Sequence, residues 1–162
     1  LSGEQDIQIK APGSLKTRIL KSGKAAGPLW GGNITLLVNR LGTSNPLNTK
    51  GSILFLEDID EYLYSYERML IQMKAAGMFE KINGLIIGEL EDMKDQEIEF
   101  GRNADQIILD ICGDLDIPII SNFPCGHGKY QVTLPLSLNA EIDTSNKKAM
   151  VTIFDSAVDL KA

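Results

Sequence analysis

Hydrophobic positions along this chain follow two spacings, one typical of helices and one of strands. Apolar residues recur every three or four positions in three segments, which predicts amphipathic helices that begin near residues 34, 62 and 104. The continuous apolar run over residues 53–56 is typical of a strand that is buried on both faces, and residues 82–87 and 117–120 are predicted to be two further apolar strands. Because strands and helices alternate, the pattern predicts a parallel α/β layer.

Capping residues support the predicted helices. Asn33 is a favourable N-cap for the first helix, and Gly42 is a favourable stop after it. Gly77 is expected to end the long middle helix. Asn103 and Gln106 resemble a capping box at the start of the third helix.

The C-terminal part of the chain has a different pattern. From Gln131 to Asp143 polar and apolar residues alternate strictly, which predicts a strand with one buried face and one wet face. Pro135 falls on the wet face and indicates an edge or a bulge. A turn at residues 144–147 followed by an apolar run at 150–154 completes a predicted terminal hairpin.

The N-terminal part contributes shorter elements. Residues 7–20 contain β-like runs broken by Pro12 and Gly13, and a turn is expected at residues 21–24. We therefore predict an α/β fold over residues 1–162, with a parallel layer flanked by antiparallel strands and a C-terminal hairpin. No repeat or low-complexity linker interrupts the sequence.

Composition narrows the possible functions. The 162 residues are 43% hydrophobic and 23% charged, which is typical of one soluble globular domain. A net charge of -6 without a basic stripe argues against nucleic-acid binding, and no segment indicates a membrane. Cys112 lies in an apolar helical segment, so a disulfide with Cys125 is not expected. Two unpaired thiols and the absence of a signal-peptide pattern predict a cytoplasmic location.

Two residues are candidates for acid–base chemistry. Glu57 closes the apolar run 53–56, and ligand-facing groups collect at the carboxyl ends of strands in open α/β sheets. His127, the single histidine, lies between Gly126 and Gly128, and these glycines allow close approach of a partner. The pair resembles the orienter and base of a hydrolytic triad. Strand ends must also carry polar residues for structural reasons, and a histidine in a turn can simply be solvated.

The expected third member of such a triad, the nucleophile, is not evident. The sequence contains no G-x-S-x-G elbow. Cys125 could serve as a nucleophile with His127 as its base, but residues two positions apart in an extended loop tend to point apart. The same two residues could bind zinc, although two ligands are too few for a stable site, so no metal is expected.

A third candidate feature precedes the first helix. Gly31 and Gly32 before Asn33 could cradle an anion, but they lack the longer pattern of a phosphate-binding loop. A simple helix start is the alternative interpretation. Trp30, the single tryptophan, could line a cleft beside these glycines, although a tryptophan more often packs in a core.

Three separated motifs, taken in order, resemble a known family. They are Gly31-Gly32-Asn33, the strand-end Glu57 followed by an R-M-L-x-Q helix at residues 68–72, and G-H-G at 126–128 followed by Q-x-T-L-P at 131–135. With their surroundings they resemble the C-terminal domain of the LD-carboxypeptidases, also called muramoyltetrapeptide carboxypeptidases. The resemblance extends from about Gly27 to Asp143.

The resemblance implies a serine peptidase with a Ser-Glu-His triad. Glu57 and His127 would be the catalytic glutamate and histidine, in a domain of swivelling β/β/α type. Trp30, Gly31 and Asn33 would border the substrate cleft. Enzymes of this family remove the terminal D-alanine from murein tetrapeptides in the cytosol during cell-wall recycling. The resemblance implies no cofactor.

The serine nucleophile of this family lies in an N-terminal domain, which we expect to be absent from this chain and to be its partner. The isolated chain is therefore expected to be inactive. A related branch acts on a peptide-nucleotide antibiotic and confers immunity to it, and this branch is the alternative function. A non-catalytic peptide-binding or dimerisation module also stays open, and a homodimer is expected.

Overall fold

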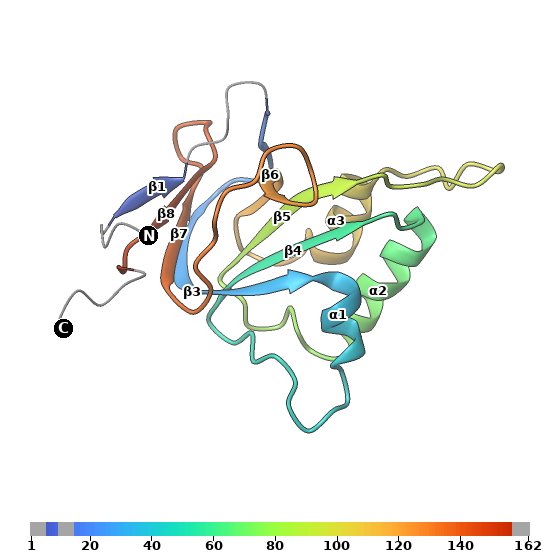
Figure 1. Cartoon of the computed structure of the whole chain (residues 1–162), viewed down its shortest axis with the longest axis horizontal. Helices are drawn as coiled ribbons and strands as arrows, with labels where there is room; N and C mark the ends of the chain where they lie inside the picture. Colours follow the sequence, from blue (N-terminus) through green and yellow to red (C-terminus); the bar gives the residue numbers. More distant parts are fainter. Residues whose placement is uncertain (1–5, 10–14, 157–162) are drawn as a thin grey trace.

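The computed structural model describes residues 6–9 and 15–156 (Figure 1). Its elements, in chain order, are β1 (Ile7–Ile9), β2 (Arg18–Lys21), β3 (Lys24–Asn33), α1 (Ile34–Asn39), β4 (Ile53–Ile59), α2 (Leu63–Ala75), β5 (Gly84–Glu91), α3 (Ala104–Cys112), β6 (Ile119–Gly126), β7 (Asn139–Asp143) and β8 (Met150–Ile153). The predicted break at Pro12 and Gly13 lies outside the described residues.

These strands form one mixed sheet in the order β1-β8-β7-β3-β4-β5-β6-β2. Strands β3 to β6 are parallel neighbours, and the pairs β3–β7, β7–β8, β8–β1 and β6–β2 are antiparallel. The prediction of an α/β fold with flanking antiparallel strands and a terminal hairpin is confirmed.

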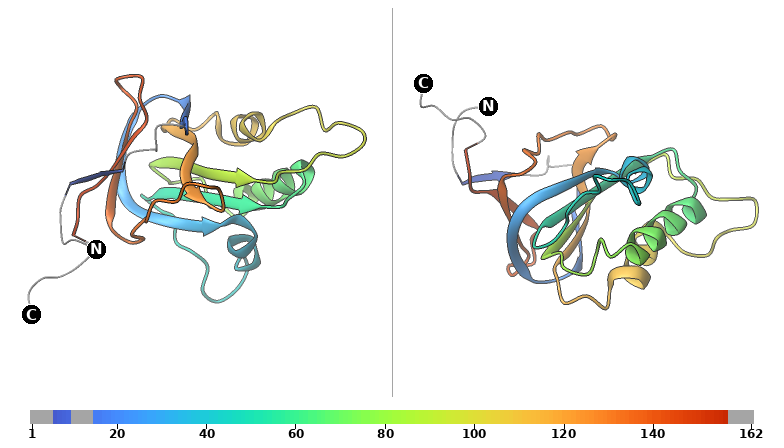
Figure 2. Two further views of the ribbon diagram at one scale, coloured as in Figure 1. Left: turned by 45° about the horizontal axis from the view of Figure 1, so that its top comes forward. Right: turned by 90° about the horizontal axis from the view of Figure 1, so that it is seen from below.

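Strand β3 joins the two kinds of pairing. Its residues 24–28 pair antiparallel with β7, and its residues 29–33 pair parallel with β4. Figure 2 shows this long strand curving from the β7–β8 hairpin to the parallel strands. One continuous strand therefore fixes the hairpin relative to the parallel layer.

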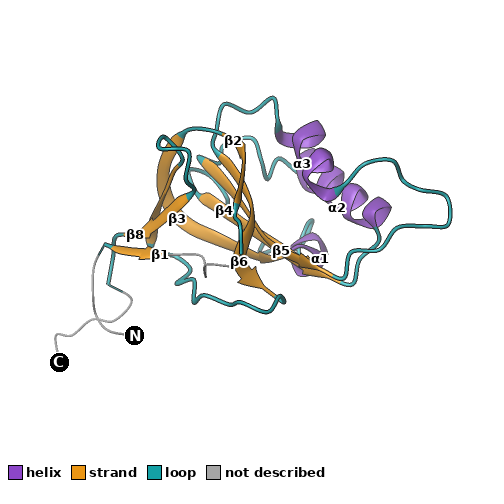
Figure 3. Cartoon of the chain, turned by 90° about the horizontal axis from the view of Figure 1, so that it is seen from above, coloured by secondary structure: helices purple, strands orange, loops and turns teal. Residues whose placement is uncertain are grey.

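Side chains pack on both faces of the parallel strands and form two cores. The helix-side core includes Ile34, Leu37, Leu54, Leu56, Tyr66, Leu70, Met73, Leu85, Ile87, Ile107 and Ile111. The hairpin-side core includes Leu29, Ile53, Phe55, Ile86, Ile120, Phe123, Ala140, Ile142, Val151 and Ile153. Helices α2 and α3 lie side by side against the first of these cores (Figure 3). Because successive residues of a strand point to opposite faces, β4 supplies both cores.

The predicted helix ends agree with the structure. The side chain of Asn33 accepts a hydrogen bond from the Leu36 amide at 3.1 Å and caps α1. Asn103 and Gln106 form both hydrogen bonds of a capping box at the start of α3. Gly77, with a φ of +79°, follows the last residues of α2. These local predictions succeeded because capping depends on neighbours in the sequence.

Strand β3 was missed by the sequence analysis. Its proline and three glycines, at positions 27, 28, 31 and 32, are unfavourable for a strand interior. Long-range packing explains them. A Cβ atom at Gly27 would lie 2.2 Å from the carbonyl oxygen of Gly51, and one at Gly31 would lie 1.8 Å from that of Phe55.

The predicted strand over residues 131–143 was wrong for its first part, because only Asn139–Asp143 forms a strand, β7. Val132 and Leu134 nevertheless pack against the hairpin-side core, and the Val132 amide donates to the Pro124 carbonyl at 2.8 Å. The alternating pattern therefore indicated correctly which side chains are buried, although these residues do not form a continuous strand. A φ of +72° at Ser137 and the missing amide of Pro135 disfavour regular pairing here.

Replacement of Gly31 by alanine should destabilise the fold more than the same replacement at Gly32. Both residues have a φ near +145° (+143° and +145°), but a Cβ at Gly32 would meet nothing within 4 Å. The pair of variants therefore isolates the contact with the Phe55 backbone. We expect Gly31→Ala to lower the free energy of unfolding by about 3 kcal/mol more than Gly32→Ala, measured by urea denaturation. Equal losses would contradict this close packing of β3 on β4.

Candidate active site

Glu57 lies within β4, near its carboxyl end. The residue is 7% exposed, so its carboxylate is largely buried. It follows Leu56, which points into the helix-side core, and therefore lies on the opposite face with Phe55. A carboxylate held on a central strand in this way has little freedom to move.

His127 directly follows β6, and its imidazole contacts Glu57. Nδ1 of His127 lies 2.7 Å from Oε2 of Glu57. The imidazole is 47% exposed, whereas the Glu57 side chain is 9% exposed. The structure thus brings the two candidate residues together, with the imidazole half-exposed and the carboxylate largely buried. Strand β4 continues past Glu57 to Ile59, so Glu57 lies within the strand and not after its end.

The contact sets the chemistry of the imidazole. Because the carboxylate of Glu57 can only accept, Nδ1 of His127 carries the proton and donates the hydrogen bond to it. Nε2 of the neutral ring then has a free lone pair and can accept a proton from a substrate or nucleophile. The carboxylate also stabilises the imidazolium that this transfer produces. The pair can therefore act as a general base with its orienting acid.

Gly88 makes this contact possible. Strand β5 lies between β4 and β6, so the side chain of Glu57 must cross it to reach His127. A Cβ atom at Gly88 would lie 3.1 Å from Cβ of Glu57 and 2.2 Å from the carbonyl oxygen of Cys125. The missing side chain thus leaves room for both the acid and the backbone that carries the histidine.

Asp58, next to Glu57, has a structural role. It is 2% exposed and accepts hydrogen bonds from Nδ2 of Asn33 at 2.9 Å and from the amide and hydroxyl of Thr35, each at 3.1 Å. These bonds tie the start of α1 to β4. Asn33 is thereby engaged by the N-cap bond and by Asp58.

The other predicted cleft residues have different surroundings. Asn33 is paired with Glu57 in the register of β3 and β4, but its side chain bonds to Asp58 and to the Leu36 amide. Trp30 is paired with Leu54, which points into the helix-side core, and it lines a hollow of about 620 Å³ with Leu37 and Arg40. It therefore lies on the face opposite Glu57. Gly31 contacts the backbone of Phe55, as described above. The structure thus brings together Glu57 and His127, and gives Gly31 and Asn33 roles in packing and capping.

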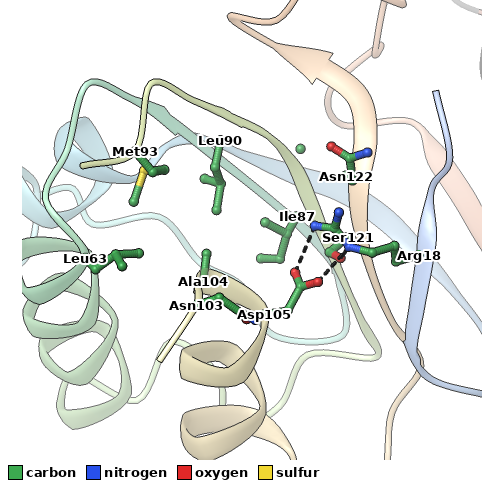
Figure 4. A pocket seen from close by; sticks show the side chains of 11 residues that line it. Arg18, Leu63, Ile87, Leu90, Met93, Asn103, Ala104, Asp105, Ser121 and Asn122 are labelled. Atoms are coloured by element: carbon green, nitrogen blue, oxygen red, sulfur yellow. Dashed lines mark hydrogen bonds and ion pairs between the residues drawn. The ribbon is translucent and has the colours of Figure 1, made fainter. Parts of the chain in front are cut away.

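A second pocket lies at the end of β5 on the helix side. It has a volume of about 630 Å³ and is lined by Ile87, Leu90, Asn103 and Ser121, among others (Figure 4). An ion pair between Nε of Arg18 and Asp105, at 2.6 Å, closes one side. Neither Glu57 nor His127 lines this pocket, so the acid–base pair and the pocket are separate features.

Glu89 is a carboxylate near the site that the sequence analysis missed. It follows the apolar run 82–87 through Gly88, much as Glu57 follows the run 53–56. The strand-end position that pointed to Glu57 was therefore also available for Glu89. In the structure Glu89 is paired with Gly126, the residue before His127.

Cys125 is poorly suited to be the nucleophile. Burial, together with the negative charge of Glu57, raises the pKa of its thiol to about 11. No hydrogen bond joins Cys125 to His127 within the part of the chain that the structure describes. Both cysteines are free thiols, in agreement with the prediction. Across residues 6–9 and 15–156, no group of three or more His, Cys, Asp or Glu side chains is arranged to hold a metal ion.

The fold and the site together define a class of protein. A histidine in contact with a carboxylate, at the carboxyl end of a parallel α/β sheet, is the arrangement that the base half of a hydrolytic triad requires. Comparison with known sequences makes the assignment specific. The family model described as LD-carboxypeptidase C-terminal domain matches residues 26–142, so the chain belongs to this family.

Individual relatives agree with this assignment. The chain is 33% identical to a "Probable murein peptide carboxypeptidase" of Bacillus subtilis over 82% of its length and 41% of the relative. It is 31% identical to the "Microcin C7 self-immunity protein MccF" of Escherichia coli over 81% of its length and 38% of the relative. The chain thus spans about two fifths of these curated relatives.

A solved structure shows the same architecture. The muramoyltetrapeptide carboxypeptidase from Oxalobacter formigenes superposes with a TM-score of 0.80 at 29% identity, over 94% of this chain and 52% of that one. The mixed sheet described above is therefore the fold of this family. The expected resemblance over residues 27–143 is confirmed almost to the residue.

The Cys125 thiol should react slowly with alkylating reagents at neutral pH. With a pKa of about 11, only about 10⁻⁴ of the thiol is ionised at pH 7, far less than for an unperturbed cysteine. The rate of iodoacetamide modification, followed by mass spectrometry, should rise as the pH approaches 11. A Cys125→Ser variant measures the background from Cys112, whose pKa is raised to about 12 by burial. Rapid modification of Cys125 at pH 7 would favour a cysteine mechanism.

Proposed function

We propose that this chain supplies the general base and its orienting acid to a serine LD-carboxypeptidase that removes the terminal D-alanine from murein tetrapeptides. The hydrogen bond of 2.7 Å between Nδ1 of His127 and Oε2 of Glu57 carries the proposal. Membership of the LD-carboxypeptidase C-terminal domain family indicates the reaction, and relatives named as murein peptide carboxypeptidases indicate the substrate.

His127 would act twice in the reaction. Nε2 removes the proton from a serine hydroxyl as its oxygen attacks the carbonyl carbon of the bond before the D-residue. The imidazolium then gives this proton to the leaving amine of D-alanine, and a water molecule releases the acyl group by the same route. Glu57 stabilises the imidazolium at each stage and keeps Nδ1 protonated.

The serine would come from a part of the protein outside this chain. Two observations support this origin: relatives are more than twice as long as the segment that matches, and the nearest thiol, Cys125, is kept protonated. The exposed edge of His127 favours such an arrangement, because Nε2 must reach a nucleophile on another segment. The murein substrate and this second domain are therefore the proposed partners.

A second candidate is the immunity branch of the family. The 31% identity to the MccF self-immunity protein supports it, and a solved structure of that protein holds aspartyl sulfamoyl adenosine. A direct comparison of D-alanine release from a murein tetrapeptide with hydrolysis of aspartyl sulfamoyl adenosine separates the two. Preference for the nucleotide would assign the immunity branch.

The cytoplasmic location and the homodimer stay predictions. Among the residues that the structure describes, no helix is long and apolar enough to cross a membrane.

Loss of either member of the pair should remove nearly all turnover in the complete protein. We expect His127→Ala and Glu57→Gln each to lower kcat for D-alanine release by about 10²–10⁴-fold, because the base is lost in one variant and its tautomer is no longer enforced in the other. Release is measured with a coupled D-amino-acid assay. Glu91→Gln, which alters an exposed carboxylate at the end of β5, is the matched control and should leave kcat unchanged.

Two outcomes would contradict the proposal. A complete protein that keeps its activity after His127→Ala would show that another group is the base. Turnover by the 162-residue chain alone would place the nucleophile within this chain, and its loss in Cys125→Ser would identify that nucleophile as the thiol.

A further inference from the structure

Glu89 is a buried carboxylate that the mechanism above does not use. The residue is 8% exposed, and its Oε2 atom is buried without a hydrogen-bond partner among the described residues. Burial, together with the nearby charge of Glu91, raises the pKa of Glu89, so its ionised form is disfavoured in the folded chain. A carboxylate placed at such a cost requires a structural or functional explanation.

The contacts of Glu89 are with the backbone that follows His127. The backbone amide of Tyr130 donates a hydrogen bond to its carboxylate. The carboxylate also lies directly against Gly128: a Cβ atom there would be 2.3 Å from Cδ of Glu89 and 2.4 Å from each of its oxygens. Glu89 therefore occupies the space that a side chain at position 128 would need.

The residue before His127 is also closely packed, but by the pairing of β5 with β6. Gly126 has a φ of +131°, and a Cβ atom there would lie 2.9 Å from the carbonyl oxygen of Glu89 and 3.4 Å from Oε2 of Glu57. His127 is thus flanked by two glycines, each packed closely against a glutamate. Glu57 contacts the imidazole, whereas Glu89 contacts Gly126 through its main-chain carbonyl and Gly128 through its carboxylate.

This arrangement bears directly on the acid–base pair. The hydrogen bond from Nδ1 of His127 is 2.7 Å long, and a hydrogen bond weakens steeply when its geometry is lost. His127 follows the last residue of β6, so the strand ladder no longer holds its backbone. The contacts of Glu89 hold the backbone that follows His127 instead.

We propose that Glu89 is a positioning residue, whose side chain fixes the backbone of residues 128–130 and so holds Nδ1 of His127 against the Glu57 carboxylate. Its consequence for the reaction rate rests on the proposed function. The positioning itself is a property of this chain and can be measured without turnover.

The single histidine of the chain makes the measurement direct. Long-range ¹H–¹⁵N NMR spectra of the ¹⁵N-labelled chain report which ring nitrogen of the neutral imidazole carries the proton. Wild-type His127 should be protonated on Nδ1. In Glu89→Ala the Nε2-protonated tautomer should become the major one, because the loop is no longer held and the contact with Glu57 is lost.

A conservative variant and a control complete the experiment. Glu89→Gln should restore the wild-type tautomer, because its amide oxygen can accept the bond from Tyr130 and its shape is preserved. Glu91→Gln removes a nearby exposed charge and should change nothing. If Glu89→Ala keeps His127 protonated on Nδ1, the proposal is overturned. If the wild-type ring is already protonated on Nε2, the acid–base pair itself is wrong, which is a failure of the proposed function.

Gly128→Ala tests the same contact without deleting Glu89, should Glu89→Ala fail to fold. The added methyl group displaces the Glu89 carboxylate and should also shift His127 toward the Nε2-protonated tautomer. An unchanged tautomer in Gly128→Ala would overturn the proposal. In the complete enzyme, Glu89→Ala should lower kcat about 100-fold with KM nearly unchanged, and Glu89→Gln should recover most of the rate.

Discussion

The site depends on a side chain that crosses a strand. Glu57 is on β4 and His127 follows β6, and β5 lies between these strands. Neighbouring strands are about 4.8 Å apart, so the backbones of β4 and β6 are separated by about twice that distance. A glutamate can cover this span only if nothing stands above β5, and Gly88 supplies the gap. Any side chain at Gly88 would also collide with the carbonyl of Cys125.

The register of β6 completes the approach. Gly88 is paired with Phe123, but the next residue of β5, Glu89, is paired with Gly126. Pro124 and Cys125 are therefore extra residues on β6, and such a bulge bends a strand and redirects the side chains that follow it. The bulge carries His127 over β5 towards Glu57. A glycine on one strand and a bulge on the next together produce the 2.7 Å contact.

Sequence reasoning succeeded where the cause of a structure is local. The caps at Asn33 and Asn103, and the buried core of β4, follow from neighbouring residues, and Glu57 and His127 could be selected from residue type and position. It failed where the cause is distant. The glycines of β3 serve contacts with Phe55 and Gly51, and the alternation at residues 131–138 reflects a loop that packs against the hairpin-side core. Glu89 was missed because its contacts with Gly128 and Tyr130 arise only after β5 and β6 have paired.

The difference in burial between the two members of the pair suits their tasks. Glu57 must remain an acceptor at a fixed position, and its largely buried place on a central strand gives it that rigidity. In the proposed mechanism His127 exchanges protons with groups outside this chain, and its half-exposed ring suits that role. Two carboxylates, Glu57 and Glu89, lie around the loop that carries the ring. In the proposed mechanism the Glu57 carboxylate, in contact with Nδ1, stabilises the positive charge that the ring acquires when it accepts a proton.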